Sequence, residues 1–329
     1  MSVALNETSL RAGEAASRAA VLKRLRVTDT IFHALTRTAA IAVLVLLGGV
    51  IVSLVIGAAP ALGTFGFSFM VTETWNPVTE TFGALAPIYG TLVTSAIAML
   101  IAVPVGLMIA FFLTELCPPV LRRPIGIAIE LLAGIPSIIY GIWGLFVFAP
   151  FLQKYVQPFL IDAFGNVPML STVFEGPPYG IGMLTAGLIL AIMVLPFVTS
   201  ISRDVFDAVP PVLKEAAYGV GCTTWEIFRY IVLPYTRVGV IGGFMLGLGR
   251  ALGETMAVTF VIGNAHKVSA SLLAPGTTIS ASIANEFTEA VGDLYTSSLV
   301  ALGLILFFIT FVVLSLARYL LLRLKRREG

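Results

Sequence analysis

The sequence predicts an all-α integral membrane protein with six transmembrane helices, and two observations carry this prediction. Hydrophobic residues make up 58% of the 329-residue chain and charged residues only 12%, whereas soluble domains contain about 25% charged residues. The apolar residues are also gathered into six separate stretches of about 20 residues or more, the length that a helix needs to cross a bilayer. No soluble domain of useful size remains.

The predicted spans lie in one transmembrane domain at residues 38–325, after a polar segment at residues 1–37. The first apolar run is longer than the ~7–15 residues of a secretory signal core, so we expect a retained first helix after a disordered or loosely packed tail. Pro104 and Pro136 predict kinks in the second and third spans. The six spans are 38–59, 87–114, 124–150, 179–202, 237–262 and 296–320.

Lysine and arginine residues set the orientation. They gather before the first span, in the second–third and fourth–fifth connections, and after the sixth span, whereas the opposite side holds only Lys154 and Lys267. By the positive-inside rule, both termini are cytoplasmic. Cys117 and Cys222 then lie on the cytoplasmic side as free thiols. We expect no metal site, because the two histidines, at positions 33 and 266, are far apart and lack companion ligands.

The longest cytoplasmic connection, residues 203–236, has the local signals of two short helices with a break between them. Pro210 and Pro211 open the first helix, which ends near Gly221. Thr223 with Glu226 three residues later is a capping box that begins the second helix. On these features alone, an amphipathic helix at the membrane surface is an equally good interpretation.

The order of residues in this connection resembles the EAA signature of ABC importer permeases, and we name residues 203–236 the EAA loop. In that family the loop is a cytoplasmic coupling helix that docks into a groove of a separate ATPase subunit. The resemblance implies that the glycine permits the turn between the two arms and that the glutamate pairs with a basic residue nearby or on the ATPase. The matching residues are Glu215, Ala216, Ala217, Gly221, Ile231, Leu233 and Pro234.

The chain lacks the residues of a nucleotide-hydrolysing motor. A P-loop requires Gly-Lys-Ser/Thr, and none of the five lysines follows a glycine. The chain is therefore expected to be a transporter subunit and not an enzyme, with ATP hydrolysis carried out by a partner.

Four longer segments, "PIYGTLVTS", "IAIELLAGIPSIIYGIWGLFVFAP", "YGVGCTTWEIFRYIVLP" and "GVIGGFMLGLGRALGETMAVTFVIGN", resemble the PstC-type permeases of phosphate-specific ABC importers. The likeness covers about residues 38–325. It implies the type I importer permease fold (a MetI-like transmembrane domain), the bacterial plasma (inner) membrane, and inorganic phosphate as the substrate. A permease for another oxyanion, such as sulfate or molybdate, and an added role in signalling phosphate status stay open as alternatives.

The same resemblance implies the partners. They are a second permease of the PstA type, a homodimeric ATPase of the PstB type and an external phosphate-binding protein of the PstS type. ATP and magnesium would be bound by the ATPase, so no cofactor is expected on this chain, and no nucleic acid is expected as a partner.

The segment "GLGRALGETMAV", residues 247–258, places two charges inside the fifth span. An arginine at a helix centre costs about 2.5–3.5 kcal/mol on insertion scales. Arg250 and Glu254 either form a structural pair or face a polar pathway where Arg250 meets an anion, and the second interpretation is favoured because intramembrane ionisable residues are functional-site candidates by default. A planar guanidinium binds two phosphate oxygens at once. Glu254 would keep anion binding weak enough for release.

Spacing predicts that these charges face protein. Gly243 and Gly247 precede Arg250 and Glu254 at intervals of 4, 3 and 4 residues, which places all of them on one face of a helix. Small residues on that face indicate a close neighbouring helix. The predicted packing glycines are Gly243, Gly247, Gly249 and Gly253.

Three further residues are candidates for the pathway. Glu130, before the "GIPS" kink of the third span, could pair with Arg250, with the second permease, or with a residue near the cytoplasmic mouth. Thr255 and Ser137 are polar candidates, although each such residue alone more often bonds to its own backbone carbonyl.

Overall fold

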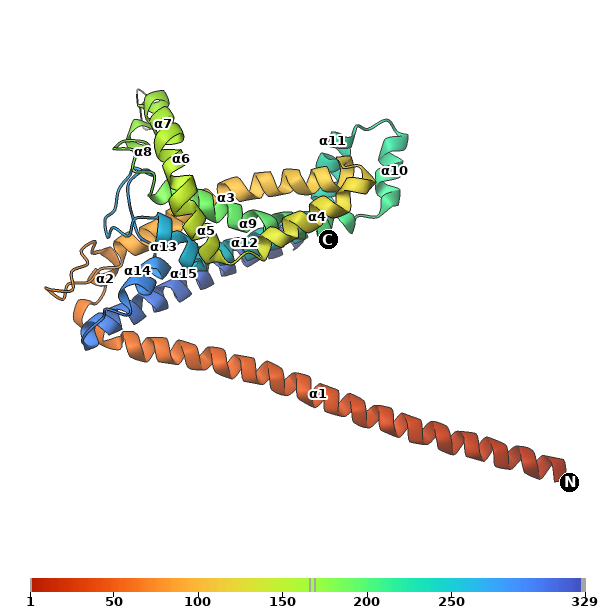
Figure 1. The fold of residues 1–329 in the computed structure, drawn as a ribbon. Coiled ribbons are helices and arrows are strands. Elements are labelled where there is room, and N and C mark those ends of the chain that lie inside the picture. Colours follow the sequence, from red (N-terminus) through yellow and green to blue (C-terminus); the bar gives the residue numbers. More distant parts are fainter. Residues whose placement is uncertain (1, 166, 169, 327–329) are drawn as a thin grey trace. The chain divides into compact units, whose positions relative to one another are not determined.

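The computed structural model describes residues 2–165, 167–168 and 170–326, and its elements are helices and connecting loops (Figure 1). Two compact units are present, Met1–Ile56 and Gly57–Gly329. Helix α1 (Ser2–Phe65) forms the first unit and the first residues of the second. The segment at residues 1–37, expected to be disordered or loosely packed, is helical from Ser2. That segment is rich in Ala, Leu and Arg, which are good helix formers.

The prediction of six membrane-spanning helices is confirmed. In the described part of the chain, six helical runs are long and apolar enough to cross a membrane: Thr28–Phe65, Leu85–Leu116, Ser137–Phe164, Met183–Asp207, Thr224–Gly253 and Asp293–Arg323. Several runs join α-helical and π-helical (η) segments. After α1 the order is α2 (Ser68–Val71), α3 (Leu85–Phe111), η1 (Phe112–Leu116), α4 (Pro119–Ala133), α5 (Ser137–Trp143), η2 (Gly144–Phe148), α6 (Ala149–Phe151), η3 (Leu152–Val156), α7 (Gln157–Phe164), α8 (Leu170–Val173), α9 (Met183–Asp207), α10 (Pro211–Gly219), α11 (Thr224–Ile227), η4 (Phe228–Val232), α12 (Leu233–Gly253), α13 (Met256–Val261), α14 (Ile279–Glu286) and α15 (Asp293–Arg326).

The third span differs from the predicted 124–150. Helix α4 is a separate element that ends at Ala133, and the spanning run begins at Ser137 and continues to Phe164. Pro136 between them has extended backbone (ψ 137°). Proline removes a helical hydrogen bond and disfavours helical geometry in the residue before it. Hydropathy alone predicted one helix where Pro136 separates two.

Helices α3 and α9 form the centre of the second unit and pack side by side (Figure 1). Glycines permit the close approach: a Cβ atom on Gly106 would lie 2.8 Å from Val198, and one on Gly187 would lie 2.6 Å from Ile97. The main core cluster is drawn from α3, α9, α12 and α13, with fully buried residues such as Ile189 and Val194. This core fixes the position of α12, whose last turn carries Arg250. We call this last turn of α12 the Arg250 turn.

The EAA loop has the predicted local structure. Pro211 is the first residue of α10, and the Thr223–Glu226 capping box is formed by both of its hydrogen bonds before α11. Gly221 between the arms has φ +93°, a conformation that residues with a Cβ rarely adopt. Cys117 and Cys222 are free thiols.

At the opposite end of the second unit, aromatic and acidic side chains join the connections to α14 and α15. Trp75 stacks on His266 with ring centroids 5.2 Å apart. Glu286 accepts hydrogen bonds from the Trp75 indole and from the Tyr295 hydroxyl. Burial lowers the pKa of His266, and the nearby Glu286 carboxylate opposes that shift. The neutral ring therefore adds to the free energy of unfolding above about pH 6.5, the pKa of an unperturbed histidine. This contribution is lost as the pH falls from there to the lower pKa of His266 in the folded protein.

Candidate functional site

Arg250 lies in the last turn of α12, inside the fifth spanning run. Its guanidinium carbon lies 4.5 Å from the centroid of the Phe197 ring on α9, a cation–π contact. Its Nε atom is buried and has no hydrogen-bond partner among the described residues. A buried donor without a partner is costly, so this guanidinium is suited to receiving an acceptor that the described chain does not itself supply.

The helix that carries Arg250 stops just before Glu254, instead of continuing through both residues as predicted. Helix α12 ends at Gly253, and Glu254 has extended backbone (φ −68°, ψ 131°). The Thr255 hydroxyl donates to the carbonyl of Gly253 across this break, at 3.3 Å. Glycine is a poor helix former and threonine competes for backbone groups, so the chain leaves the helix here. Arg250 and Glu254 form no ion pair among the described residues.

The break at Glu254 lies beside another interrupted helix. Helix α13, which begins after Thr255, packs on α5, which begins at Ser137 after the Pro136 break. A Cβ atom on Gly141 of α5 would lie 2.7 Å from Phe260 of α13, so the two helices are in close contact. Non-helical backbone at membrane depth occurs only where it is buried in protein or lines an aqueous cavity. The structure thus brings the Ser137 and Thr255 segments onto neighbouring helices.

Glu130 pairs with Arg203 and not with Arg250. The Arg203 guanidinium lies 2.5 Å from the Glu130 carboxylate and 3.3 Å from that of Asp204. The three belong to a polar pocket of about 350 Å³ between α4 and α9, which Arg122, Arg123 and Asp207 also line. Of the alternatives predicted for Glu130, the structure contradicts the pair with Arg250 and leaves the other two as predictions.

The four packing glycines divide into two pairs. Gly243 and Gly247 are buried against α9, where their Cβ atoms would lie 2.8 Å from Ile201 and 3.0 Å from Val194. Gly249 faces α15 at ordinary contact distance, 3.7 Å from Leu314, and Gly253 has nothing within 4 Å of the Cβ position. Close helix approach therefore depends on the first pair.

We expect Gly243→Ala to destabilise the protein by about 1–3 kcal/mol, the usual cost of overpacking, because its new methyl group would lie 2.8 Å from Ile201. Thermal unfolding in detergent measures the effect. Gly242→Ala is the matched control, since a Cβ at that position meets nothing within 4 Å. Equal melting temperatures for both variants would contradict the packing described here.

Some of the EAA residues pack into the protein and others are exposed. Ala217 is buried in the core cluster at this end of the unit, and Ile231 and Leu233 pack against that cluster. Glu215 is exposed and forms no ion pair among the described residues; the neighbouring Lys214 pairs with Glu115 instead, at 2.6 Å. The remaining signature residues, Ala216, Gly221 and Pro234, are exposed.

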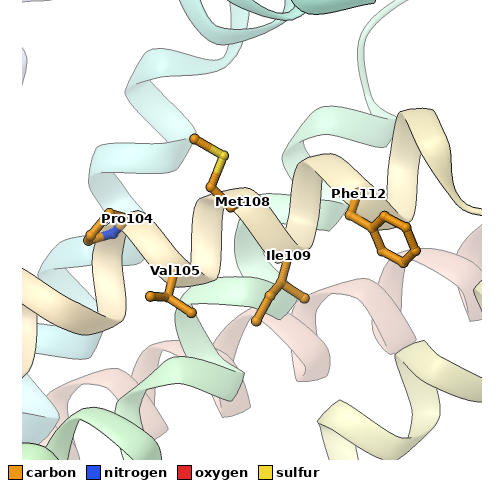
Figure 2. Close-up of a pocket in the computed structure, with 5 residues that line it drawn as sticks. All are labelled: Pro104, Val105, Met108, Ile109 and Phe112. Carbon is orange, nitrogen blue, oxygen red and sulfur yellow. The ribbon is translucent and has the colours of Figure 1, made fainter.

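A second pocket lies on the exposed face of α3 and is entirely apolar. Figure 2 shows its lining residues Pro104, Val105, Met108, Ile109 and Phe112, around a volume of about 400 Å³. It offers no hydrogen-bonding side chain to an anion, so it is not a candidate for an oxyanion site.

Sequence reasoning missed three contacts of these residues: Phe197 under Arg250, Arg203 on Glu130, and Lys214 on Glu115. The ion-pair partners are 73 and 99 positions apart in the chain. No local pattern indicates such pairs, although Glu115 and Arg203 each directly follow a predicted span.

Comparison with known proteins decides the family. Residues 102–326 match the family model "Binding-protein-dependent transport system inner membrane component". The phosphate transport system permease protein PstC of Mesorhizobium japonicum is 72% identical over 95% of this chain and 96% of its own length. The protein of the same name from Pasteurella multocida is 58% identical over 92% of this chain and 94% of its own. The chain belongs to the PstC-type permeases of this family.

A PstC-type permease is a membrane subunit of an ABC transporter, and this one is a multi-pass membrane protein by its six apolar helical runs. Its fold is that of type I importer permeases. The crystal structure of a bacterial alginate ABC transporter with a pentasaccharide-bound periplasmic protein matches 88% of this chain and 93% of the matched chain, with a TM-score of 0.56 and 16% sequence identity. At that identity the similarity shows the fold alone.

Proposed function

We propose that this PstC-type permease is a subunit of an ATP-driven importer of inorganic phosphate and forms half of its translocation pathway. Relatives named as phosphate transport system permeases, at 54–72% identity over more than nine-tenths of the chain, support phosphate over sulfate or molybdate. The observation that carries the site is the buried Nε–H of Arg250 within a spanning helix, which has no hydrogen-bond partner in the described part of the chain.

The geometry around Arg250 suits weak, reversible anion binding. Phe197 supports one face of the guanidinium, which leaves its edge donors for oxygens of phosphate. Glu254 begins the non-helical turn just beyond α12. A carboxylate near the cation reduces the affinity of the site for an anion, and a transport pathway requires such release. Thr255, Ser137 and Glu130 are proposed as further polar residues of the pathway.

The proposed assembly supplies what this chain lacks. A homodimeric ATPase of the PstB type binds ATP and magnesium and receives the EAA loop, where the exposed Glu215 is available for a basic partner. A PstA-type permease completes the pathway, and a PstS-type binding protein delivers phosphate from outside. The distribution of lysine and arginine supports an orientation in a bacterial membrane with both termini in the cytoplasm.

Deletion of the gene for this protein in its host tests the proposed function. Cells without it should lose high-affinity phosphate uptake at micromolar phosphate, while sulfate and molybdate uptake stay unchanged, because the substrate class is set by this pathway. Uptake of radiolabelled oxyanions measures both. Loss of sulfate or molybdate uptake with phosphate uptake intact would overturn the proposal.

We expect Glu254→Gln to weaken discrimination between phosphate and sulfate. A carboxylate can accept a hydrogen bond from a protonated phosphate oxygen, which sulfate does not offer near neutral pH, whereas the amide can also donate. The change should reduce the phosphate preference about tenfold, the value of one hydrogen bond to a charged group. Competition of sulfate with phosphate uptake measures it; an unchanged preference would remove Glu254 from selectivity.

A further inference from the structure

The first arm of the EAA loop, α10, is attached to the membrane helices at few points. Its residues Val212, Leu213 and Tyr218 are 70%, 41% and 46% exposed. Ala217 is the buried residue of this helix. Figure 1 shows α10 beside α11 and the C-terminal end of α3. A helix with so little buried surface needs another contact to hold a defined position.

That contact is an ion pair with η1, the π-helical segment that continues α3. Lys214 of α10 lies 2.6 Å from the Glu115 carboxylate in η1, and their side chains are only 18% and 8% exposed. Glu115 sits where the helix widens to π geometry before it ends at Cys117, and such π segments occur frequently at functional sites. Removing one member of a buried pair leaves an uncompensated charge, so separating the two groups is costly.

The second arm is attached in a different way. Phe228 of η4 contacts Phe111 of α3 and Phe206 of α9, with ring centroids 4.3 and 5.4 Å apart. Apolar contacts are non-directional, whereas the Lys214–Glu115 contact is also a charge-assisted hydrogen bond of 2.6 Å, which requires a defined donor–acceptor geometry. The ion pair is therefore the directional contact between α10 and α3.

From α3 the packing leads to the Arg250 turn. Val198 of α9 lies between two glycines, where Cβ atoms would be 2.8 Å away on Gly106 of α3 and 3.3 Å away on Gly247 of α12. The neighbouring Phe197 carries the ring against Arg250. Interiors packed this densely transmit displacement. A shift of α3 must move Val198 or α12. Val198 is the neighbour of Phe197, and α12 carries Arg250 itself.

We propose that the Lys214–Glu115 ion pair is the positioning contact through which movement of α10 reaches α3, α9 and the Arg250 turn. The inference rests on the proposed function, because it assigns the pair to coupling between the ATPase and the pathway. Neither residue touches the substrate. Their role is to turn a displacement of α10 into a displacement of the membrane helices.

The test uses the complete importer, with the second permease, the ATPase and the binding protein, reconstituted in vesicles. Phosphate uptake and ATP hydrolysis are measured together in Lys214→Met, in Glu115→Gln and in the exchanged pair Lys214→Glu with Glu115→Lys. Lys154→Met is the matched control, since that lysine lies outside the EAA loop. Each single variant should retain the ATPase on co-purification but transport about tenfold less phosphate per ATP, within the usual range of coupling effects; the exchanged pair should restore the ratio.

If the single variants transport as much phosphate per ATP hydrolysed as the wild type, the inference is overturned. If a single variant does not assemble, the exchanged pair decides: restored assembly and ratio support the ion pair, and failure to restore the ratio in an assembled complex overturns it. Wild-type vesicles that take up no phosphate would defeat the proposed function instead, which separates the two failures.

Discussion

Arg250→Gln should lower phosphate uptake about 100-fold in the reconstituted importer while the ATPase remains bound. Two hydrogen bonds from the guanidinium to phosphate would be lost, and bonds to charged groups are worth roughly 1.5–3 kcal/mol each. The Nε–H of this side chain is already buried without a partner among the described residues, so the wild-type protein bears the cost of an empty site, which phosphate bound as proposed would relieve. Radiolabelled phosphate uptake into vesicles measures the loss.

Two further variants give this result its meaning. Arg250→Lys keeps the charge but loses the planar fork, and it should fall between wild type and the glutamine variant. Arg318→Gln, an exposed arginine of α15, is the control and should transport normally. ATP hydrolysis that survives in Arg250→Gln separates the pathway from the motor; retained uptake in that variant would refute the assignment of the site.

Gly221→Leu should prevent stable association of the ATPase subunit. The residue lies between the arms of the EAA loop with φ +93°, and a Cβ there meets no atom of the described residues within 4 Å. The strain of a side chain at positive φ costs about 1–2 kcal/mol, and the side chain itself would project from the surface proposed to dock. Loss of the ATPase on co-purification measures the effect.

Gly292→Leu is the matched control for that experiment. Gly292 has φ +96° and an equally open Cβ position, but it precedes α15 and lies outside the EAA loop. The control carries the same backbone strain without touching the proposed docking surface, so it should retain the ATPase. Equal loss in both variants would show that strain, and not docking, is responsible.

Much of the fold follows from local sequence. Hydropathy predicts the six runs because a bilayer demands about 20 apolar residues for each helix, and the EAA loop follows from prolines, glycines and a capping box that act within a few residues. The exceptions are also physical. Hydropathy is blind to Pro136, which separates α4 from α5, because the residues on either side of it are equally apolar.

The candidate site is less accessible to sequence reasoning. Its charged residue was predictable, since Arg250 stands out in an apolar span, but the break at Glu254 was not. Glycines such as Gly253 are tolerated within membrane helices, and here the chain leaves the helix where α13 packs on α5. The partners of Glu130, Glu115 and Arg250 depend on how α4, α3 and α9 come together, which no local pattern encodes.

The most direct test of the account is uphill transport by the purified components. Vesicles containing this chain, the second permease and the ATPase, with ATP inside and phosphate-loaded binding protein outside, should accumulate phosphate above the external concentration and should not accumulate sulfate or molybdate. Vesicles prepared without this chain should accumulate none of the three. Phosphate accumulation that does not require this chain, or accumulation of sulfate or molybdate in place of phosphate, would contradict it.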